Sequence, residues 1–463
     1  MEKATSSEPT QVWLVLADMF SIRTFFDSKI IDLLANRLGP RLELVVLVEP
    51  TWTRGRLERV EGLHATQYLE LFPWKVGLAE RVGRRADIAL DSLIGFYPLA
   101  VRFNLRHGFH QERMRPGHDN GFLDSARVGP LPRWEAADRL MLRWHFSARR
   151  YVSHALVKRM RSECSAVVVS NLQSELTVPF LNAARRLHRP VVGYVASWDH
   201  PVGKGVVSPH LDTYIVQNDV MRDELGRYHG VDPAQVEVTG WPQSDAFFQP
   251  RPREEFDGLL TRLGLNPVRP VVLVMGNTPT NTPYEPAFFE RLLGWWESSR
   301  ANERFSLLFR PHPRDHKWEE RFAPVVGRVG AAVEPQSEAT IESLAVMLAH
   351  GSCVVSNAGT ILLDSLTNDR PAVCVLYDEG APLGETWAAL NVLGAHYREL
   401  MSSNAFYRAE SFDEVVAGIE RALADPGELS AERRRVAHEV VGELDGKAGE
   451  RVCDAIVRAA TTR

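Results

Sequence analysis

The chain has little cysteine. Its four cysteines stand far apart in 463 residues, and no two of them have the short spacing of a zinc or redox site: Cys164, Cys353, Cys374 and Cys453. Three of the four lie in or beside apolar runs. We therefore expect buried thiols in a reducing cytoplasm, and no metal site built on cysteine.

Long apolar runs and an excess of basic residues are also missing. No stretch of about 18 apolar residues occurs, and residues 1–10 are polar, unlike a signal peptide. The formal net charge is −5, and the Lys and Arg residues are spread along the chain, which argues against nucleic acid as a partner. We expect a cytoplasmic protein. The apolar, arginine-flanked segment 87–103 fits either a buried core helix, which we favour, or a peripheral helix at the inner face of a membrane.

What the chain does have is a repeated alternation of β-branched runs and helical patterns. This pattern is typical of parallel sheets covered by helices, and 463 residues exceed the length that one core serves. We expect an α/β protein of two Rossmann-like lobes with a cleft between them. The expected strands are 12–16, 42–48, 166–170, 190–195, 213–217 and 236–239, then 270–275, 305–309, 353–356 and 372–376. Expected helices include 178–188 and 218–228.

Interruptions of this alternation suggest the domain limits. The first lobe is expected over 11–243, with an Arg-rich helical insertion at about 67–157, a position where insertions tend to define a second substrate. A polar, proline-bearing stretch at 241–254 precedes the second lobe, expected over 255–427. Helices follow over 428–463. Ahead of them, Ser411 and Glu414 have the spacing of a capping box.

The segment 353–364, CVVSNAGTILLD, predicts a buried strand, a turn of small residues and a helix. Asn357, Ala358, Gly359 and Thr360 form the turn, whose N–H groups at the helix N-terminus favour a phosphate. Asp364 lies one turn further, where its carboxylate can accept hydrogen bonds from a ribose. An ordinary tight turn is the alternative.

Two further strand ends of the second lobe carry polar residues. Arg310 and His312 stand among prolines that stiffen the loop, so they can meet a diphosphate leaving group without a metal ion. Gly276 and Asn277 follow the first strand of this lobe, where parallel sheets place ligands. Surface-loop residues without a ligand are the alternative.

In the first lobe, the loop after strand 190–195 carries Trp198, Asp199, His200 and Lys204. A hydroxyl that attacks an anomeric carbon needs a general base, and Asp199 or His200 can serve, as can Asp18 at the end of the first strand. Asp199 is our first choice. The alternative is structural: Trp198 anchors the loop and Asp199 pairs with Lys204.

Together these segments resemble the GT-B superfamily, in particular its surface-polysaccharide branch with CDP-glycerol glycerophosphotransferases and UDP-N-acetylglucosamine epimerases. The resemblance covers about 165–380. Segment 355–364 is similar to the stretch that binds the donor's phosphates and ribose, and 310–313 (RPHP) to the element near the diphosphate. Segment 238–245 (VTGWPQSD) resembles the one that opens the interlobe linker.

The first-lobe loop 198–205 (WDHPVGKG) is similar to the Trp-His-Gly-Thr-Pro-Leu-Lys loop of polyol-phosphate transferases, but Asp199 stands where those enzymes carry histidine. A carboxylate base suits attack on an anomeric carbon and is repelled by a phosphate. Gln243 also replaces an arginine usual in those transferases. The resemblance thus implies a glycosyltransferase with a nucleoside diphosphate sugar as co-substrate, no other cofactor, and a carbohydrate or lipid-linked acceptor. A polyol-phosphate transferase, an epimerase and a non-catalytic nucleotide-sugar binding protein are the alternatives.

Overall fold

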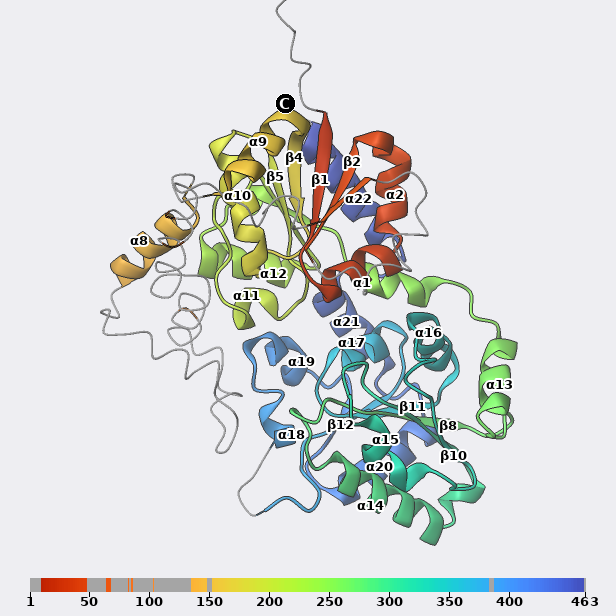
Figure 1. The fold of residues 1–463 in the computed structure, drawn as a ribbon. Coiled ribbons are helices and arrows are strands. Elements are labelled where there is room, and N and C mark those ends of the chain that lie inside the picture. The colour runs from red at the N-terminus through yellow and green to blue at the C-terminus, as the bar shows by residue number, and fades with distance from the viewer. Residues whose placement is uncertain are drawn as a thin grey trace, which may run out of the picture. The chain divides into compact units, whose positions relative to one another are not determined.

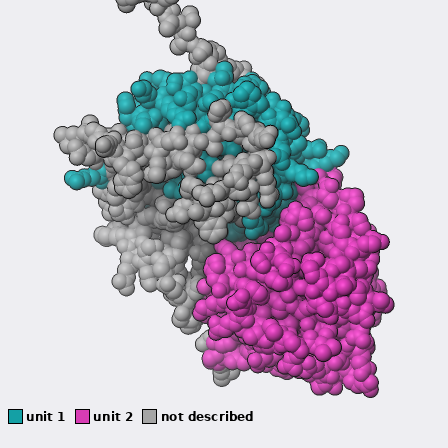
Figure 2. All heavy atoms as spheres, turned by 45° about the vertical axis from the view of Figure 1, so that its right-hand side comes forward, with its two compact units in different colours: residues 1–110, 118–243, 447–463 teal, residues 111–117, 244–446 magenta. Residues whose placement is uncertain are grey.

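The structure is a computed structural model that describes residues 10–47, 64–67, 135–147, 152–382 and 387–461, with Val82, Arg85 and Phe103. These residues form two compact units: unit 1 holds those up to 243 and from 447 onward, and unit 2 holds 244–446 (Figure 2). Each unit has its own parallel sheet with helices on it (Figure 1). Most of the predicted insertion 67–157 and of segment 87–103 lies outside the described residues.

Unit 1 contains a seven-stranded sheet in the order β3-β2-β1-β4-β5-β6-β7, with every neighbouring pair parallel. The strands are β1 (Gln11–Leu16), β2 (Leu42–Val46), β3 (His64–Gln67), β4 (Cys164–Val169), β5 (Val191–Tyr194), β6 (Thr213–Val216) and β7 (Val236–Val238). All six predicted strands are confirmed. The strand order reverses between β1 and β4, which is where ligands bind in such sheets.

The helices of unit 1 are α1 (Met19–Asp27), α2 (Ile30–Leu38), α8 (Glu135–His145), α9 (His154–Glu163), α10 (Val178–Arg186), α11 (His200–Gly203), α12 (Asp219–Glu224) and α22 (Ala448–Thr461). The prediction of a helix over 178–188 is confirmed by α10. The one over 218–228 corresponds to α12 and a π-helical turn, Leu225–His229, that continues it.

Unit 2 has a six-stranded parallel sheet in the order β10-β9-β8-β11-β12-β13. Its strands are β8 (Val271–Met275), β9 (Ser306–Arg310), β10 (Ala331–Val333), β11 (Cys353–Ser356), β12 (Ala372–Val375) and β13 (Tyr407–Ala409). The four predicted strands are confirmed. Here the order reverses between β8 and β11. Sheets of this kind bind ligands at such a reversal, between the turns that follow the two strands.

The helices of unit 2 are α13 (Arg253–Arg262), α14 (Glu285–Ser298), α15 (Trp318–Arg321), α16 (Ile341–His350), α17 (Thr360–Thr367), α18 (Trp387–Leu390), α19 (Arg398–Ser402), α20 (Phe412–Ala424) and α21 (Ser430–Val441). Helix α14 buries Phe289, Leu292, Leu293 and Trp296, spaced for one helical face, in a core shared with β8, β9 and β11. Each such side chain contributes about 2 kcal/mol relative to exposure.

The C-terminal helices belong to different units. Helix α20 begins after Ser411, whose Oγ accepts a hydrogen bond from the Glu414 N–H at 3.4 Å. The Glu414 carboxylate accepts from the Glu410 N–H, so we find only one half of the predicted capping box. Helix α21 packs against α17 in unit 2, whereas α22 packs against α2 in unit 1.

Two expectations from composition can be compared with the structure. All four cysteines are buried and unpaired, as predicted. Burial raises the pKa of Cys353 and Cys374 to about 12, which keeps both thiols protonated. Within the described residues, no helix has both the length and the apolarity needed to cross a membrane.

Candidate functional site

The turns after β8 and β11 are joined by direct hydrogen bonds at the reversal point of the unit 2 sheet. The Asn277 side-chain amide donates to the Ala358 carbonyl at 2.7 Å, and Ser356 Oγ donates to the Met275 carbonyl at 2.8 Å. The structure therefore brings together two segments that lie about 80 positions apart in the chain and that the sequence singled out separately.

The side chain of Asn357 fixes the conformation of the turn through hydrogen bonds. Its side-chain amide donates to the carbonyls of Val375 at 2.6 Å and Ala388 at 3.0 Å, and its Oδ1 accepts from Asn391 at 2.6 Å. With 5% of its surface exposed, Asn357 acts on the turn through these contacts.

Gly359 opens helix α17 with φ at 146°, a backbone conformation that residues with a Cβ rarely adopt. Thr360 is exposed, and Gly359 and Asp364 are half-buried. Among the described residues, a Cβ on Gly359 would meet only Ile361 Cγ2, at 4.0 Å, so these residues leave the turn open on that side. The geometry is that of a helix N-terminus with accessible backbone donors. The predicted phosphate and ribose contacts of these residues stay predictions.

Gly276 has a packing reason to be glycine. A Cβ there would come within 2.6 Å of Phe322 Cζ and 3.3 Å of Glu285 Oε2. Its N–H donates to the Arg310 carbonyl at 2.9 Å, which continues the ladder between β8 and β9.

Arg310 is buried, with 8% of its surface exposed, and its guanidinium is engaged by protein groups. It pairs with the buried Glu334 carboxylate, and donates to Ser343 Oγ at 2.8 Å and to the Thr340 carbonyl at 2.7 Å. These contacts tie β9 to the loop after β10 and to the first turn of α16. The contact of Arg310 with a diphosphate, expected from the sequence, stays a prediction.

His312 is held in the loop after β9 by backbone contacts. Its Nδ1 accepts from the Arg314 N–H at 3.0 Å, and its carbonyl accepts from the Gln336 amide at 2.7 Å. Since Nδ1 accepts, the neutral ring carries its proton on Nε2. A proton on Nε2 is the form that can donate to an anion.

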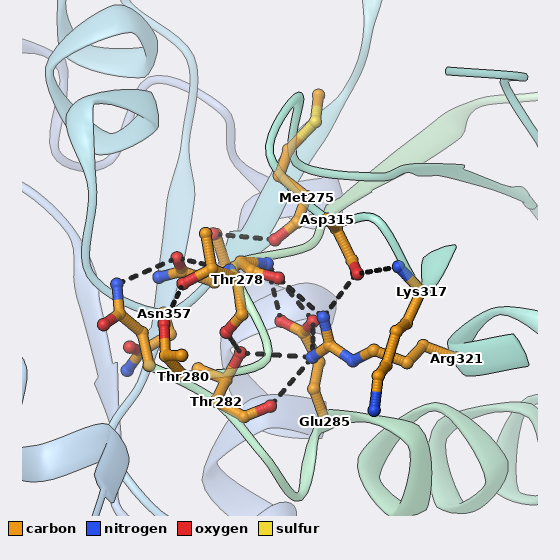
Figure 3. Close-up of polar contacts among 12 residues, drawn as sticks. Met275, Thr278, Thr280, Thr282, Glu285, Asp315, Lys317, Arg321 and Asn357 are labelled. Atoms are coloured by element: carbon orange, nitrogen blue, oxygen red, sulfur yellow. Dashed lines mark hydrogen bonds and ion pairs between the residues drawn. The ribbon is translucent and has the colours of Figure 1, made fainter. Parts of the chain in front are cut away.

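A buried ionic cluster that no sequence pattern indicated lies next to these turns (Figure 3). Arg321, at the end of α15, pairs with Asp315 and, at 2.8 Å, with Glu285 Oε2. It also donates to the carbonyls of Asn277 and Thr282, both at 2.8 Å. One guanidinium thus holds the turn after β8, the start of α14 and the loop that carries His312.

Glu285 completes this cluster. Both of its carboxyl oxygens lie within hydrogen-bond distance of the Asn277 N–H, at 3.0 and 3.2 Å. Burial raises the pKa of Glu285 to about 8, and the nearby Arg321 opposes this rise. Glu285 and Asp315 share one arginine, so the buried cluster of three side chains has no net charge only when one of the two acids keeps its proton.

Glu285 also lines a recess of about 380 Å³, mouth included, at the carboxyl ends of β8, β11 and β12. Its polar wall includes Asn357, Asp378 and Glu379. The recess therefore adjoins the turn that the sequence singled out.

In unit 1, the loop after β5 places its predicted residues in different environments. Asp199 is half-buried and pairs with the exposed Lys204 at 3.4 Å. His200 is 7% exposed and begins the short helix α11, and Trp198 is 6% exposed. The structural alternative, an anchoring tryptophan and an Asp199–Lys204 pair, is thus compatible with the geometry.

Asp18, the third candidate base, caps helix α1. Its Oδ1 accepts from the Ser21 N–H at 2.7 Å, and its Oδ2 accepts from the Asn171 amide at 2.6 Å. Both oxygens therefore have structural partners, at the point where the strand order of unit 1 reverses.

Among the described residues, no three His, Cys, Asp or Glu side chains are grouped so as to hold a metal ion.

Comparison with solved structures identifies the fold. The UDP-GlcNAc 2-epimerase from Neisseria meningitidis, bound to UDP-GlcNAc, matches with a TM-score of 0.55 and 10% identity over 97% of this chain and 100% of that one. The S. aureus MnaA–UDP structure matches with a TM-score of 0.54 and 11% identity, covering 97% and 96%. The wall teichoic acid polymerase TagF matches with 0.53 and 10%, covering 99% and 91%.

No protein-family model and no curated protein sequence matches the chain. The structural matches establish the class: an α/β protein with two Rossmann-like lobes of the GT-B type, as the sequence predicted. More particularly, the structures it resembles include UDP-GlcNAc 2-epimerases and the wall teichoic acid polymerase TagF.

Proposed function

We propose that this protein is a glycosyltransferase that moves a sugar from a nucleoside diphosphate to a carbohydrate or lipid-linked acceptor in surface-glycan synthesis. The observation that carries the proposal is the turn 357–360: a glycine at φ 146° opens α17 at the reversal point of the sheet, and buried asparagines fix it. Such an N-terminus favours a diphosphate. Structural neighbours bound to UDP and UDP-GlcNAc add support.

The proposed roles follow from this donor position. Gly276, Asn277, Asn357 and Ala358 shape the phosphate site, and Gly359 and Thr360 offer their N–H groups to it. Arg310 contributes a positive charge and His312 a hydrogen-bond donor. Asp364 binds the ribose, and no metal is required. Asp199 or His200 accepts the proton of the acceptor hydroxyl, with Trp198, Lys204 and Asp18 near the acceptor. Direct attack of that hydroxyl inverts the anomeric carbon. The cytoplasmic location, with contact at the inner face of a membrane, belongs to the same proposal.

An epimerase is the second candidate, because the epimerase match extends over 97% of this chain. The products separate the candidates. A glycosyltransferase releases a nucleoside diphosphate and needs an acceptor, whereas an epimerase yields an isomer of unchanged mass without one. A polyol-phosphate transferase releases a nucleoside monophosphate.

The first experiment is ligand binding followed by thermal unfolding. A ligand present at about 100 times its dissociation constant adds about 2.7 kcal/mol to the stability, so UDP, GDP and CDP can be ranked. Gly359→Ala should abolish the shift, because the turn cannot keep its conformation. The matched control is Gly264→Ala, a glycine at φ 75° with open space around it. A shift of equal size in wild type and Gly359→Ala would contradict the proposed donor site.

Mass spectrometry of the released nucleotide then distinguishes the two transferases, and NMR of the recovered nucleotide sugar detects an epimer, whose mass is unchanged. Release of a nucleoside diphosphate only when an acceptor is present supports the glycosyltransferase. Turnover of a bound nucleotide sugar to its isomer would replace that proposal by the epimerase. Binding without turnover over a panel of acceptors would favour a nucleotide-sugar binding protein.

A further inference from the structure

A chain of hydrogen bonds joins three strand ends in unit 1. Asp18, after β1, accepts from the Asn171 amide at 2.6 Å. Asn171, after β4, accepts from the Gln173 N–H at 3.0 Å. The Gln173 side-chain Oε1 lies 3.1 Å from Nδ1 of His200, after β5. The chain therefore links two of the three candidate bases, Asp18 at the reversal point of the sheet and His200.

The last contact in this chain determines the tautomer of His200. An amide oxygen can only accept a hydrogen bond, so Nδ1 of His200 must carry the proton. In the neutral ring the basic lone pair then resides on Nε2. Gln173 and His200 are 9% and 7% exposed, so water competes weakly for this bond.

Gln173 is itself held in place. Its backbone N–H is fixed by Asn171, which Asp18 fixes in turn. Its side-chain Nε2 is buried and has no hydrogen-bond partner within the described part of the chain, so His200 is the partner that orients the amide. A buried donor without a partner costs about 1–3 kcal/mol of stability. A protein keeps such a group where the group has a function.

Asp199 is placed differently. Its carboxylate lies 3.4 Å from Lys204 Nζ, so it is paired with an ammonium group of its own loop. Helix α12 and the turn Leu225–His229 pack against α11 and bring further titratable groups, Glu224 and His229 among them. Nε2 of His229 lies 2.8 Å from the Pro201 carbonyl, and its Nδ1 accepts from the Val207 N–H. His229 is thus engaged with the backbone.

We propose that Gln173 is a positioning residue that holds His200 with its proton on Nδ1, and that His200, through Nε2, is the base of the reaction. The proposal rests on the proposed function. In the step, the acceptor O–H gives its proton to Nε2, and the oxygen lone pair bonds to the anomeric carbon. The bond from that carbon to the diphosphate breaks, and its electron pair leaves with the nucleoside diphosphate.

The tautomer is measured first, and this needs no substrate. In the full-length protein labelled with ¹⁵N-histidine, His200 is assigned by comparison with His200→Gln. Wild type should show the proton on Nδ1, Gln173→Glu should keep it there, and Gln173→Met should lose this preference. A proton on Nε2 in wild type would mean that the amide of Gln173 donates, and would overturn the proposal. Thermal unfolding checks that each variant is folded.

The pH profile of kcat/KM is the second readout. A base works unprotonated, so the acidic limb reports its titration. Gln173→Glu places a negative charge beside the ring and should move this limb about one unit to higher pH. Gln173→Met should lower kcat about tenfold or more, and His200→Gln about a hundredfold or more.

Lys204→Met tests the rival base, since it changes the partner of Asp199 and leaves Gln173 in place; because Lys204 is itself placed near the acceptor, its pH profile and not its rate is compared. It should not move the acidic limb. A limb that moves in Lys204→Met and stays in Gln173→Glu would assign the base to Asp199 and overturn the proposal. A chain that turns over no nucleotide sugar would overturn the proposed function and the base role together, whereas the tautomer measurement still decides the role of Gln173.

Discussion

Glu285 is an acid closed off from water beside one arginine and a second acid. Its pKa is raised from the ordinary 4.5 to about 8 by burial. Between these two values the folded protein holds a proton that the unfolded chain has released. The contribution of Glu285 to the free energy of unfolding therefore falls as the pH rises through this window and levels off above about pH 8.

The matching prediction compares wild type with Glu285→Gln, which cannot ionise. From about pH 6.5 to about pH 8, wild type should lose about 2 kcal/mol of stability relative to the variant, as measured by urea denaturation. Glu290→Gln, on the exposed side of the same helix, is the control and should follow wild type. Parallel curves for wild type and Glu285→Gln would show that Glu285 is ionised throughout, with Arg321 outweighing burial.

At this scale the sequence indicated only part of the site. Residues that follow apolar strands, such as Asn277 and Gly359, can be found because the strand itself marks their position. Arg321, Glu285 and Gln173 cannot, because a charged or amide residue in a helix or loop has the same local pattern whether it is buried or solvated. Their partners lie at distances in the chain that no local pattern encodes.

At the scale of elements, Arg310 links β9 to the loop after β10 and to α16. Removing either Arg310 or Glu334 leaves the other charge buried alone, which should cost about 3–5 kcal/mol. The double variant Arg310→Met/Glu334→Leu should cost much less. Urea denaturation of the four proteins gives the coupling energy as a double-mutant cycle.

Nucleotide binding by the double variant then decides the role of Arg310. If UDP raises the thermal unfolding midpoint of the double variant as much as that of wild type, Arg310 has a structural role only. If stability is recovered and the UDP shift is lost, its guanidinium contacts the diphosphate as the sequence suggested. Additive losses of stability would show instead that the buried pair is not coupled.

Strands with continuous apolar runs were predicted within a few residues, since two buried faces leave no polar positions. The three missed strands lack such runs. β3 reads HATQ, β10 has only three residues, and β13 alternates a buried, an exposed and a buried position around Arg408. All three are edge strands that pair on one side only, so the apolar pattern that marks a buried strand is weaker in their sequences.

At the scale of the whole molecule, the described chain leaves unit 1 after residue 243 and returns to it at residue 447. The returning helix α22 contributes Val452, Cys453, Ala455 and Ile456 to the same core as β1, β2 and α2. The amphipathic pattern of residues 448–461 predicts a helix, but it cannot indicate which of two cores the helix completes. This is why the C-terminal helices were expected as a single block.

The return of α22 makes the stability of unit 1 depend on the last residues of the chain. Ile456 is fully buried, so Ile456→Asp should destabilise unit 1 by about 3 kcal/mol or more, because a carboxylate would lose its hydration. Arg458→Ala is the control on the same helix: it removes an exposed pair with Glu237 at 2.9 Å, which is worth about 1 kcal/mol or less. Limited proteolysis followed by mass spectrometry locates the effect. In Ile456→Asp, the first new cleavages should fall within residues up to 243, and UDP-dependent protection of unit 2 should persist. First cleavages within 244–446 would mean that α22 stabilises the molecule through unit 2, contrary to the packing of its apolar face.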